Sequence, residues 1–229
     1  MFLFKNHIKK LYLKLFGKYR LTALINKEIQ DNWTILDAGC GRSSSLKDIK
    51  KGSYKIGLDI YEPYIIESKK QSIHNDYVIG DVRKLPFKSD SFDCAVSIDV
   101  LEHLNKEDGL EMIKEMKRVA KRKIILTTPN GFLPTYAGPK DNPEERHLSG
   151  WTYDELKKLG FKVCGLNGLK MFWIVRHGRA IVRGGLPVFS SLTVDISEFF
   201  AYYYPSLAFQ FFFVKNLNNK NKLSNGKNN

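Results

Sequence analysis

The sequence predicts an α/β fold in which helices cover a doubly wound, mostly parallel sheet of seven strands. Short apolar runs alternate with helical patterns along most of the chain, which is typical of this class. A glycine turn follows the first of these runs, as at a ligand-binding crossover. The 229 residues, 43% of them apolar, suit one large domain better than two. We expect that domain in residues 31–215, after a basic helical cap in residues 1–30 and before a disordered polar tail in residues 216–229.

Residues 2–19 have the spacing of an amphipathic helix, with apolar side chains on one stripe and lysines on the other. Because a lysine recurs every few residues along the sequence, this segment lacks the uninterrupted apolar core of a signal peptide. The uncharged run at residues 199–214 is too short for a membrane span and contains Pro205. The helix therefore has two interpretations. It is either a lid over the ligand-binding cleft of the predicted domain, or a peripheral membrane contact through residues 1–20.

Strands and helices then alternate along the predicted domain. Pro63 suits the first turn of the second helix, Asn105 suits the cap of the third, and Thr152 with Glu155 forms a capping box for the fourth. Residues 167–205 form an aromatic-rich insertion before the last strand, without a clear period. The expected strands are residues 34–37, 54–59, 77–80, 92–98, 123–127, 161–166 and 210–215. The expected helices are residues 43–51, 63–72, 106–120 and 152–160.

Charge and cysteine content limit the function classes. The net charge is +13, and the first 20 and last 15 residues supply ten of these charges. These ends are either solvated lysine-rich segments or attract an anionic membrane or nucleic acid. The three cysteines lie far apart among apolar residues, which indicates a reducing, cytoplasmic environment. No Cys/His cluster has the spacing of zinc ligands, so we expect no metal.

The segment 35–43 joins a strand to a helix through two glycines, and Asp59 ends the next strand 18 residues after Gly41. Glycines let a ligand approach the backbone, and a carboxylate at the second strand can accept the hydroxyls of a ribose. A dinucleotide dehydrogenase would share this pattern. However, Ser44 replaces the third glycine of that motif, and a third acid, Asp81, follows the third strand.

With these motifs the sequence resembles the class I S-adenosylmethionine-dependent methyltransferases, which have a Rossmann-like fold. The resemblance covers residues 33–166, where five motifs follow the family's order and approximate spacing. It implies S-adenosyl-L-methionine as the cofactor and methyl transfer as the activity. The motifs are Leu-Asp-Ala-Gly-Cys-Gly at 36–41, Gly-Leu-Asp at 57–59, Gly-Asp-Val at 80–82, Leu-Pro-Phe at 85–87 with Ser-Phe-Asp at 91–93, and Val-Leu-Glu-His-Leu at 100–104.

The resemblance assigns the first cofactor contacts to the ends of the first two strands. Asp37, Gly39 and Gly41 match the motif that faces the methionine part of the cofactor. Asp59 matches the acid that holds the ribose hydroxyls, and Ile60 beside it is a further candidate contact. An alternative for Asp37 is that it only fixes the turn.

Four further candidates follow the third and fourth strands. Asp81 matches the acid that takes the adenine amino group, with Val82 nearby. Ile98 and Asp99 match the segment beside the sulfonium and the amino acid end of the cofactor. The sequence departs from many members of the family at Arg42-Ser43, which leaves the contacts of residues 42–45 open.

A sulfonium methyl is already activated, so a base is needed only if the acceptor must lose a proton. His103 and His147 are the candidate bases; each could instead be a packed or ordering histidine. His147 lies in a His-x-x-x-Trp-Thr stretch similar to that of some family members acting on small molecules or sugars. No Asn-Pro-Pro-Tyr tetrad follows the fourth strand, so amino-group methylation of adenine or glutamine has no motif support.

The aromatic insertion favours a small-molecule or lipid-like methyl acceptor. The alternatives are an RNA methyltransferase, or a non-catalytic protein that binds a membrane surface or nucleic acid and keeps a vestigial fold. We do not expect nucleic acid as the partner, because no aromatic-plus-basic RNA-binding module is present. The pattern predicts neither the identity of the acceptor nor the oligomeric state.

Overall fold

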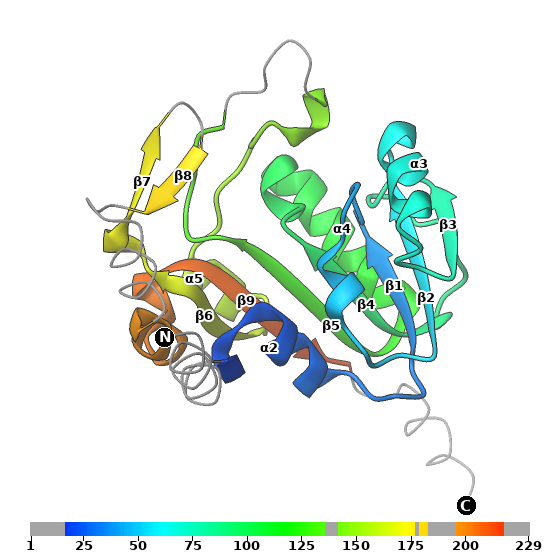
Figure 1. Cartoon of the computed structure of the whole chain (residues 1–229), viewed down its shortest axis with the longest axis horizontal. Helices are drawn as coiled ribbons and strands as arrows, with labels where there is room; N and C mark the ends of the chain where they lie inside the picture. Colours follow the sequence, from blue (N-terminus) through cyan, green and yellow to red (C-terminus); the bar gives the residue numbers. More distant parts are fainter. Residues whose placement is uncertain (1–16, 136–141, 177–178, 183–195, 218–229) are drawn as a thin grey trace, which may run out of the picture. The chain divides into compact units, whose positions relative to one another are not determined.

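The computed structural model describes residues 17–135, 142–176, 179–182 and 196–217 (Figure 1). Most of the helix expected at residues 2–19, and most of the tail expected at 216–229, lie outside these residues. Within the described part, residues 17–19 form a single 3-10 turn, and a helix at Leu21–Glu28 follows that we did not expect. No helix among the described residues is long and apolar enough to cross a membrane.

The described elements follow the predicted alternation of strands and helices. The helices are α2 (Leu21–Glu28), α3 (Glu62–Lys70), α4 (Lys106–Val119), α5 (Tyr153–Lys158) and an α-helical segment at 196–203. The 3-10 turns are η1 (Gly17–Tyr19), η2 (Ser45–Asp48), η3 (Leu101–His103), η4 (Pro143–Glu145), η5 (Lys170–Phe172) and η6 (Pro205–Leu207). The strands are β1 (Thr34–Ala38), β2 (Tyr54–Asp59), β3 (Asp76–Ile79), β4 (Phe92–Ile98), β5 (Ala120–Pro129), β6 (Lys162–Leu169), β7 (Trp173–Arg176), β8 (Arg179–Val182) and β9 (Ala208–Asn216).

Seven strands form one sheet in the order β3-β2-β1-β4-β5-β9-β6 (Figure 1), which confirms the expected fold class. β1 pairs in parallel with both β2 and β4, and β2 pairs in parallel with β3. The strand order therefore reverses at β1, where the chain first winds toward β3 and then returns to β4. In open α/β sheets, ligands bind at the carboxyl ends of the strands at such a reversal. This rule places the candidate site at the ends of β1 and β4.

The chain divides into two compact units. Of the described residues, the β1 unit contains 29–98, 106–126 and 214–217, and the β6 unit contains 17–28, 99–105 and those between 127 and 213. In the β1 unit, β4 is buried over most of its length, as expected for a central parallel strand covered on both faces. α4 buries Met112, Ile113 and Met116 at helical spacing, and this stripe supplies its contact with the core.

In the β6 unit, the predicted capping box of α5 is present. The Thr152 hydroxyl accepts a hydrogen bond from the Glu155 N–H (3.3 Å), and the Glu155 carboxylate accepts from the Thr152 N–H (2.8 Å). The insertion between β6 and β9 contains a two-stranded antiparallel hairpin, β7-β8, which its lack of period did not indicate. The insertion also contains the α-helical segment at 196–203.

The helix expected at residues 43–51 is wrong, because only the 3-10 turn η2 forms there. Ser44 explains the difference. Its hydroxyl donates to the Asp37 carboxylate (2.5 Å) and accepts from the Leu46 N–H (3.0 Å), so the segment is tied to the end of β1. Side-chain bonds to nearby backbone compete with regular helix in this way.

Gly165→Ala is expected to destabilise the protein by about 3 kcal/mol, because overpacking a tight site displaces backbone. An added Cβ would lie 2.0 Å from the Ala201 carbonyl oxygen and 2.5 Å from the Ala208 Cβ. Urea denaturation measures the change. Gly131→Ala is the control: its Cβ would lie 3.5 Å from the Lys170 amine, an ordinary contact, so it should lose only the roughly 1–2 kcal/mol of a left-handed alanine at φ 81°. Equal midpoints for the two variants would contradict the expectation.

Candidate active site

The glycine turn after β1 is pinned to the end of β2. Gly39 and Gly41 have φ of 80° and 58°, a backbone conformation that favours glycine. The N–H groups of Gly39 and Cys40 both donate to the Leu58 carbonyl oxygen, at 2.7 and 2.9 Å. The turn therefore keeps a fixed position against β2, and the acid that ends β2 lies directly beside it.

Asp59 is buried at this junction and links the two strand ends. One carboxylate oxygen accepts the Gly41 N–H (2.8 Å), and the other accepts the Tyr61 N–H (2.9 Å). A carboxylate can accept about four hydrogen bonds, so Asp59 can still accept hydroxyl groups of a ligand. Burial raises the pKa of Asp59, while the backbone N–H bonds of Tyr61 and Gly41 act against this shift. This geometry fits the expected role of Asp59 toward a ribose.

Open space beside Gly41 allows a direct test of whether a ligand fits the turn. A Cβ added at Gly41 would meet no atom within 4 Å. A Cβ at Gly57, under the turn, would lie 2.8 Å from the His74 ring and 3.0 Å from the Cys40 sulfur. Gly57 is therefore glycine because of internal packing, whereas the Gly41 position leaves room for a ligand against the backbone. The residues of the turn fit S-adenosylmethionine in this respect.

Gly41→Ala is expected to weaken S-adenosylhomocysteine binding at least tenfold, because the new methyl group fills the open space beside the turn. The left-handed backbone should cost only about 1–2 kcal/mol of stability. Calorimetric titration and thermal unfolding separate the two effects. Gly131→Ala carries the same kind of strain at φ 81° and should bind as the wild type does. Unchanged affinity in Gly41→Ala would show that the ligand lies elsewhere.

Asp37 lies beneath the turn, in a buried cluster that the sequence only partly revealed. Its Oδ2 accepts from the Ser44 hydroxyl (2.5 Å) and lies 2.8 Å from the His74 Nε2, and the side chains of Asp37 and His74 are almost without solvent exposure. The backbone N–H of His74 donates to the Tyr77 hydroxyl (3.1 Å), and this hydroxyl donates to the Ser68 carbonyl oxygen. Asp37 thus fixes the turn from below, and its expected contact with the cofactor stays a prediction.

Asp81 and its neighbours follow β3. Arg83 holds the Asp81 carboxylate through its guanidinium (2.6 and 2.9 Å) and also reaches Asp108 (2.9 Å). The side-chain hydrogen bonds of Arg83 lower the pKa of Asp81. The acid is therefore ionised and partly exposed, while Val82 beside it is buried. An adenine amino group at Asp81 would share the carboxylate with Arg83.

Ile98 ends β4, and Asp99 follows it with φ 55°, a left-handed conformation that is uncommon outside glycine. Thr127 fixes this conformation, since its hydroxyl accepts the Asp99 N–H (3.0 Å) and donates to the Asp99 carboxylate (2.6 Å). The Gln210 amide also donates to that carboxylate, and Gln210 in turn accepts from the Asn167 amide. Asp99 is an exposed residue whose carboxyl oxygen is held by these partners.

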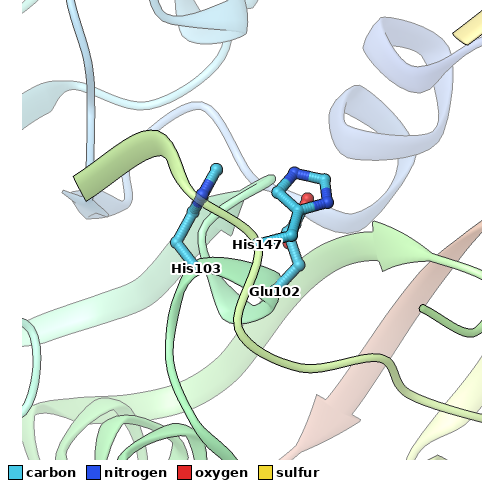
Figure 2. Close-up of side chains that lie close together, drawn as sticks. All are labelled: Glu102, His103 and His147. Atoms are coloured by element: carbon cyan, nitrogen blue, oxygen red, sulfur yellow. The ribbon is translucent and has the colours of Figure 1, made fainter. Parts of the chain in front are cut away.

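The candidate bases come together in the β6 unit. Figure 2 shows Glu102 and His103 on η3 and His147 on the chain that follows η4. The two imidazole ring centres are 4.8 Å apart. The Glu102 carboxylate is buried beside them and accepts the Thr128 hydroxyl (3.1 Å). The two candidate bases are therefore neighbours, which the sequence did not indicate, and their catalytic role stays a prediction.

Hydrogen bonds and burial set the protonation of the two rings. His147 Nδ1 lies 2.7 Å from the Leu133 carbonyl oxygen, which can only accept, so Nδ1 carries the proton. Burial and then the charge of His103 lower the pKa of His147 to about 4, and burial also lowers the pKa of His103. Burial and the charge of Asp99 raise the pKa of Glu102 well above its ordinary value. Both imidazoles are thus neutral near pH 7, and His147 Nε2 has a free lone pair.

Sequence reasoning missed several residues of this arrangement. Glu102 belongs to the Val-Leu-Glu-His-Leu motif, which carried the resemblance without a role for its glutamate. His74, Thr127 and Gln210 gave no motif signal. The only hint for Gln210 is that it interrupts an otherwise apolar run in β9.

Comparison with known proteins agrees with the fold and the glycine turn. Residues 36–126 match the family model described as a methyltransferase domain. Among solved structures, a SAM-dependent methyltransferase from Methanosarcina mazei superposes with a TM-score of 0.54 at 18% identity, over 86% of this chain and 98% of that one. One from Mesorhizobium loti gives 0.54 at 13% identity, over 85% and 97%. At these identities the structural likeness shows the fold alone.

Sequence relatives share the same region of the chain. A tRNA (carboxymethyluridine(34)-5-O)-methyltransferase from Arabidopsis thaliana is 30% identical over 140 residues, which are 60% of this chain and 32% of that protein. A sterol 24-C-methyltransferase from Gibberella zeae is 31% identical over 119 residues, 48% of this chain and 29% of that protein. The chain spans about a third of the length of these two relatives.

Proposed function

Since residues 36–126 belong to the methyltransferase domain family and the sheet has the class I, Rossmann-like architecture, we propose that this protein transfers a methyl group from S-adenosylmethionine. The observation that carries the proposal is the pairing of Gly41 with Asp59 at the reversal of strand order. An open glycine backbone and a buried carboxylate that can still accept hydroxyl groups are what a nucleoside with a free diol requires.

Each motif residue then has a proposed part in holding the cofactor. Asp59 accepts the ribose hydroxyls, while the turn at Gly39 and Gly41 lies along the methionine part. Asp81 accepts the adenine amino group, and Ile60, whose side chain is 47% exposed, offers an apolar surface to a ring. Val82, Ile98 and Asp99 complete the proposed set, while Asp37 keeps the turn in position from below.

The cofactor supplies an activated methyl group, so the protein's work is alignment and exclusion of water. The acceptor atom must lie in line with the bond that breaks, within a few ångströms of the methyl carbon. If the acceptor is a hydroxyl, it must also lose a proton. We assign that step to the cluster of Glu102, His103 and His147, in which His147 Nε2 is the candidate base.

We further propose that the acceptor is a small or lipid-like molecule. The support is a set of exposed apolar and aromatic side chains in the β6 unit, at residues 196–207, which include the helical segment 196–203 and η6. Tyr19 packs against this set, with its ring centre 5.8 Å from that of Phe199. Large exposed apolar surfaces mark interaction sites more often than chance. Its members are Ile196, Phe199, Phe200, Tyr203, Tyr204 and Leu207.

A peripheral membrane contact through residues 1–20 would bring the protein to such an acceptor and stays part of this proposal. The charge of that segment supports it: six cations and no acid. The second candidate acceptor is RNA, because one relative is named as a tRNA methyltransferase. No aromatic-plus-basic RNA-binding module supports that candidate in this chain.

Two measurements test the proposal on the full-length protein. Calorimetric titration with S-adenosylhomocysteine should give one site per chain, and absence of binding would overturn the methyltransferase function. Tritiated S-adenosylmethionine is then incubated with the protein and either an organic extract of cells or total tRNA. Label that partitions into the organic phase supports a small or lipid-like acceptor. Label found in tRNA alone replaces that acceptor with RNA.

A further inference from the structure

Glu102, His103 and His147 present metal-ligating atoms that all lie within 4.8 Å of one another (Figure 2). Although His147 follows His103 by 44 residues, a pair of backbone hydrogen bonds, here called the backbone clasp, holds the two segments together. The N–H groups of Leu148 and Ser149 both donate to the Glu102 carbonyl oxygen, at 2.8 and 3.1 Å. Since Leu148 directly follows His147, the clasp holds the imidazole of His147 against η3. The cluster is therefore built by the fold and does not depend on chance contact of exposed side chains.

Two features of the imidazoles suit a bound ion. His147 donates its Nδ1 proton to the Leu133 carbonyl oxygen, which leaves the Nε2 lone pair for coordination. Metal-bound histidines almost always have their second nitrogen fixed in this way. His103 Nδ1 is buried and has no hydrogen-bond partner among the described residues. A buried polar atom without a partner requires an explanation, and an unseen ion is one of the few available.

Charge supports the same conclusion. The Glu102 carboxylate is buried, and it accepts a hydrogen bond from the Thr128 hydroxyl (3.1 Å). Within the part of the chain that the structure describes, Glu102 forms no ion pair with Lys or Arg. Buried carboxylates are normally paired with a cation or coordinate a metal. A divalent cation would provide the missing positive charge.

We propose that Glu102, His103 and His147 bind a divalent transition-metal ion. Two imidazoles and one carboxylate favour ions such as Mn²⁺ and Zn²⁺ over Mg²⁺, which prefers oxygen ligands. This site departs from our expectation that the chain binds no metal, because the ligands are not close in sequence.

The role of the ion rests on the proposed methyl transfer. Three protein ligands leave a coordination position free, where an acceptor hydroxyl binds and becomes more acidic. The hydroxyl releases its proton to solvent, and its oxygen forms the new bond to the methyl carbon. The carbon–sulfur bond breaks, and sulfur keeps the electron pair as a neutral thioether. The ion thus takes over the work otherwise assigned to His147 as a base.

Ion binding is measured on the full-length protein without cofactor or acceptor. After chelator treatment and dialysis, MnCl₂ is titrated with detection of free Mn²⁺ by electron paramagnetic resonance, and ZnCl₂ is titrated by calorimetry. We expect one ion per chain, with MgCl₂ binding at least tenfold more weakly. A wild-type protein that binds neither Mn²⁺ nor Zn²⁺, or that binds Mg²⁺ more tightly than both, overturns the proposal.

Variants locate the ion. Glu102→Gln and His147→Gln should each weaken binding at least 100-fold, whereas Glu144→Gln, which changes an exposed acid of η4, should bind as the wild type does. Thermal unfolding identifies any variant that fails to fold, and the wild-type titration still decides the proposal in that case. Unchanged affinity in both folded variants places the ion elsewhere and refutes it. S-adenosylhomocysteine binding is measured in parallel, so loss of the proposed methyltransferase function is distinguished from loss of the ion site.

Discussion

Asp59→Ala is expected to lower the affinity for S-adenosylhomocysteine 30- to 1000-fold. The carboxylate can accept ribose hydroxyls while it accepts the Gly41 and Tyr61 N–H groups. Loss of a charge-assisted pair of hydrogen bonds costs roughly 2–4 kcal/mol. Calorimetric titration of purified protein at pH 7.5 measures the difference. Wild-type affinity in a folded Asp59→Ala protein would exclude Asp59 from the site.

Asp59→Asn separates charge from shape in this test. It keeps one accepting oxygen in nearly the same volume, so its affinity should lie between those of the wild type and the alanine variant. The pH dependence supplies a further check. Because burial raises the pKa of Asp59, wild-type affinity should fall with decreasing pH sooner than an ordinary aspartate near 3.8 would allow. The asparagine variant should lack this part of the pH dependence.

His74→Leu is expected to destabilise the protein by about 3–5 kcal/mol, as breaking one side of a buried pair does. The leucine removes the group that lies 2.8 Å from the Asp37 carboxylate and leaves a buried carboxylate with Ser44 as its remaining side-chain partner. Leucine is similar in volume to histidine, so a cavity contributes little to the loss. Urea denaturation, with its midpoint and slope, gives the change in the free energy of unfolding.

His74→Gln is the matched variant, since its amide can still donate to Asp37. It should lose clearly less stability than His74→Leu. If the two variants lose the same free energy of unfolding, packing of the imidazole ring, and not its bond to Asp37, stabilises the buried cluster around Asp37. If neither loses stability, the Asp37–His74 pair has no structural role under the glycine turn.

The sequence alone determined the features that depend on neighbouring residues. The apolar run of β1, the glycines that follow it and the acid that ends β2 are each readable because strand period, turn chemistry and helix caps act over a few residues. The capping box at Thr152 and Glu155 is of the same kind and is present as predicted. These local signals, with the family motifs, were enough for the fold class.

Only the tertiary structure decided which distant side chains meet. His74 lies 37 residues from Asp37, Gln210 lies 111 residues from Asp99, and the clasp that brings His147 to Glu102 closes a loop of more than 40 residues. No local propensity encodes such a pairing, because it follows from how strands are ordered and how loops return over them. The helix expected at 43–51 is likewise a single 3-10 turn, in which the Ser44 hydroxyl accepts from the Leu46 N–H and also donates to Asp37 at the end of β1. The physical reason is that burial and long-range hydrogen bonding, which are set by the packed fold, outweigh local preference where the two disagree.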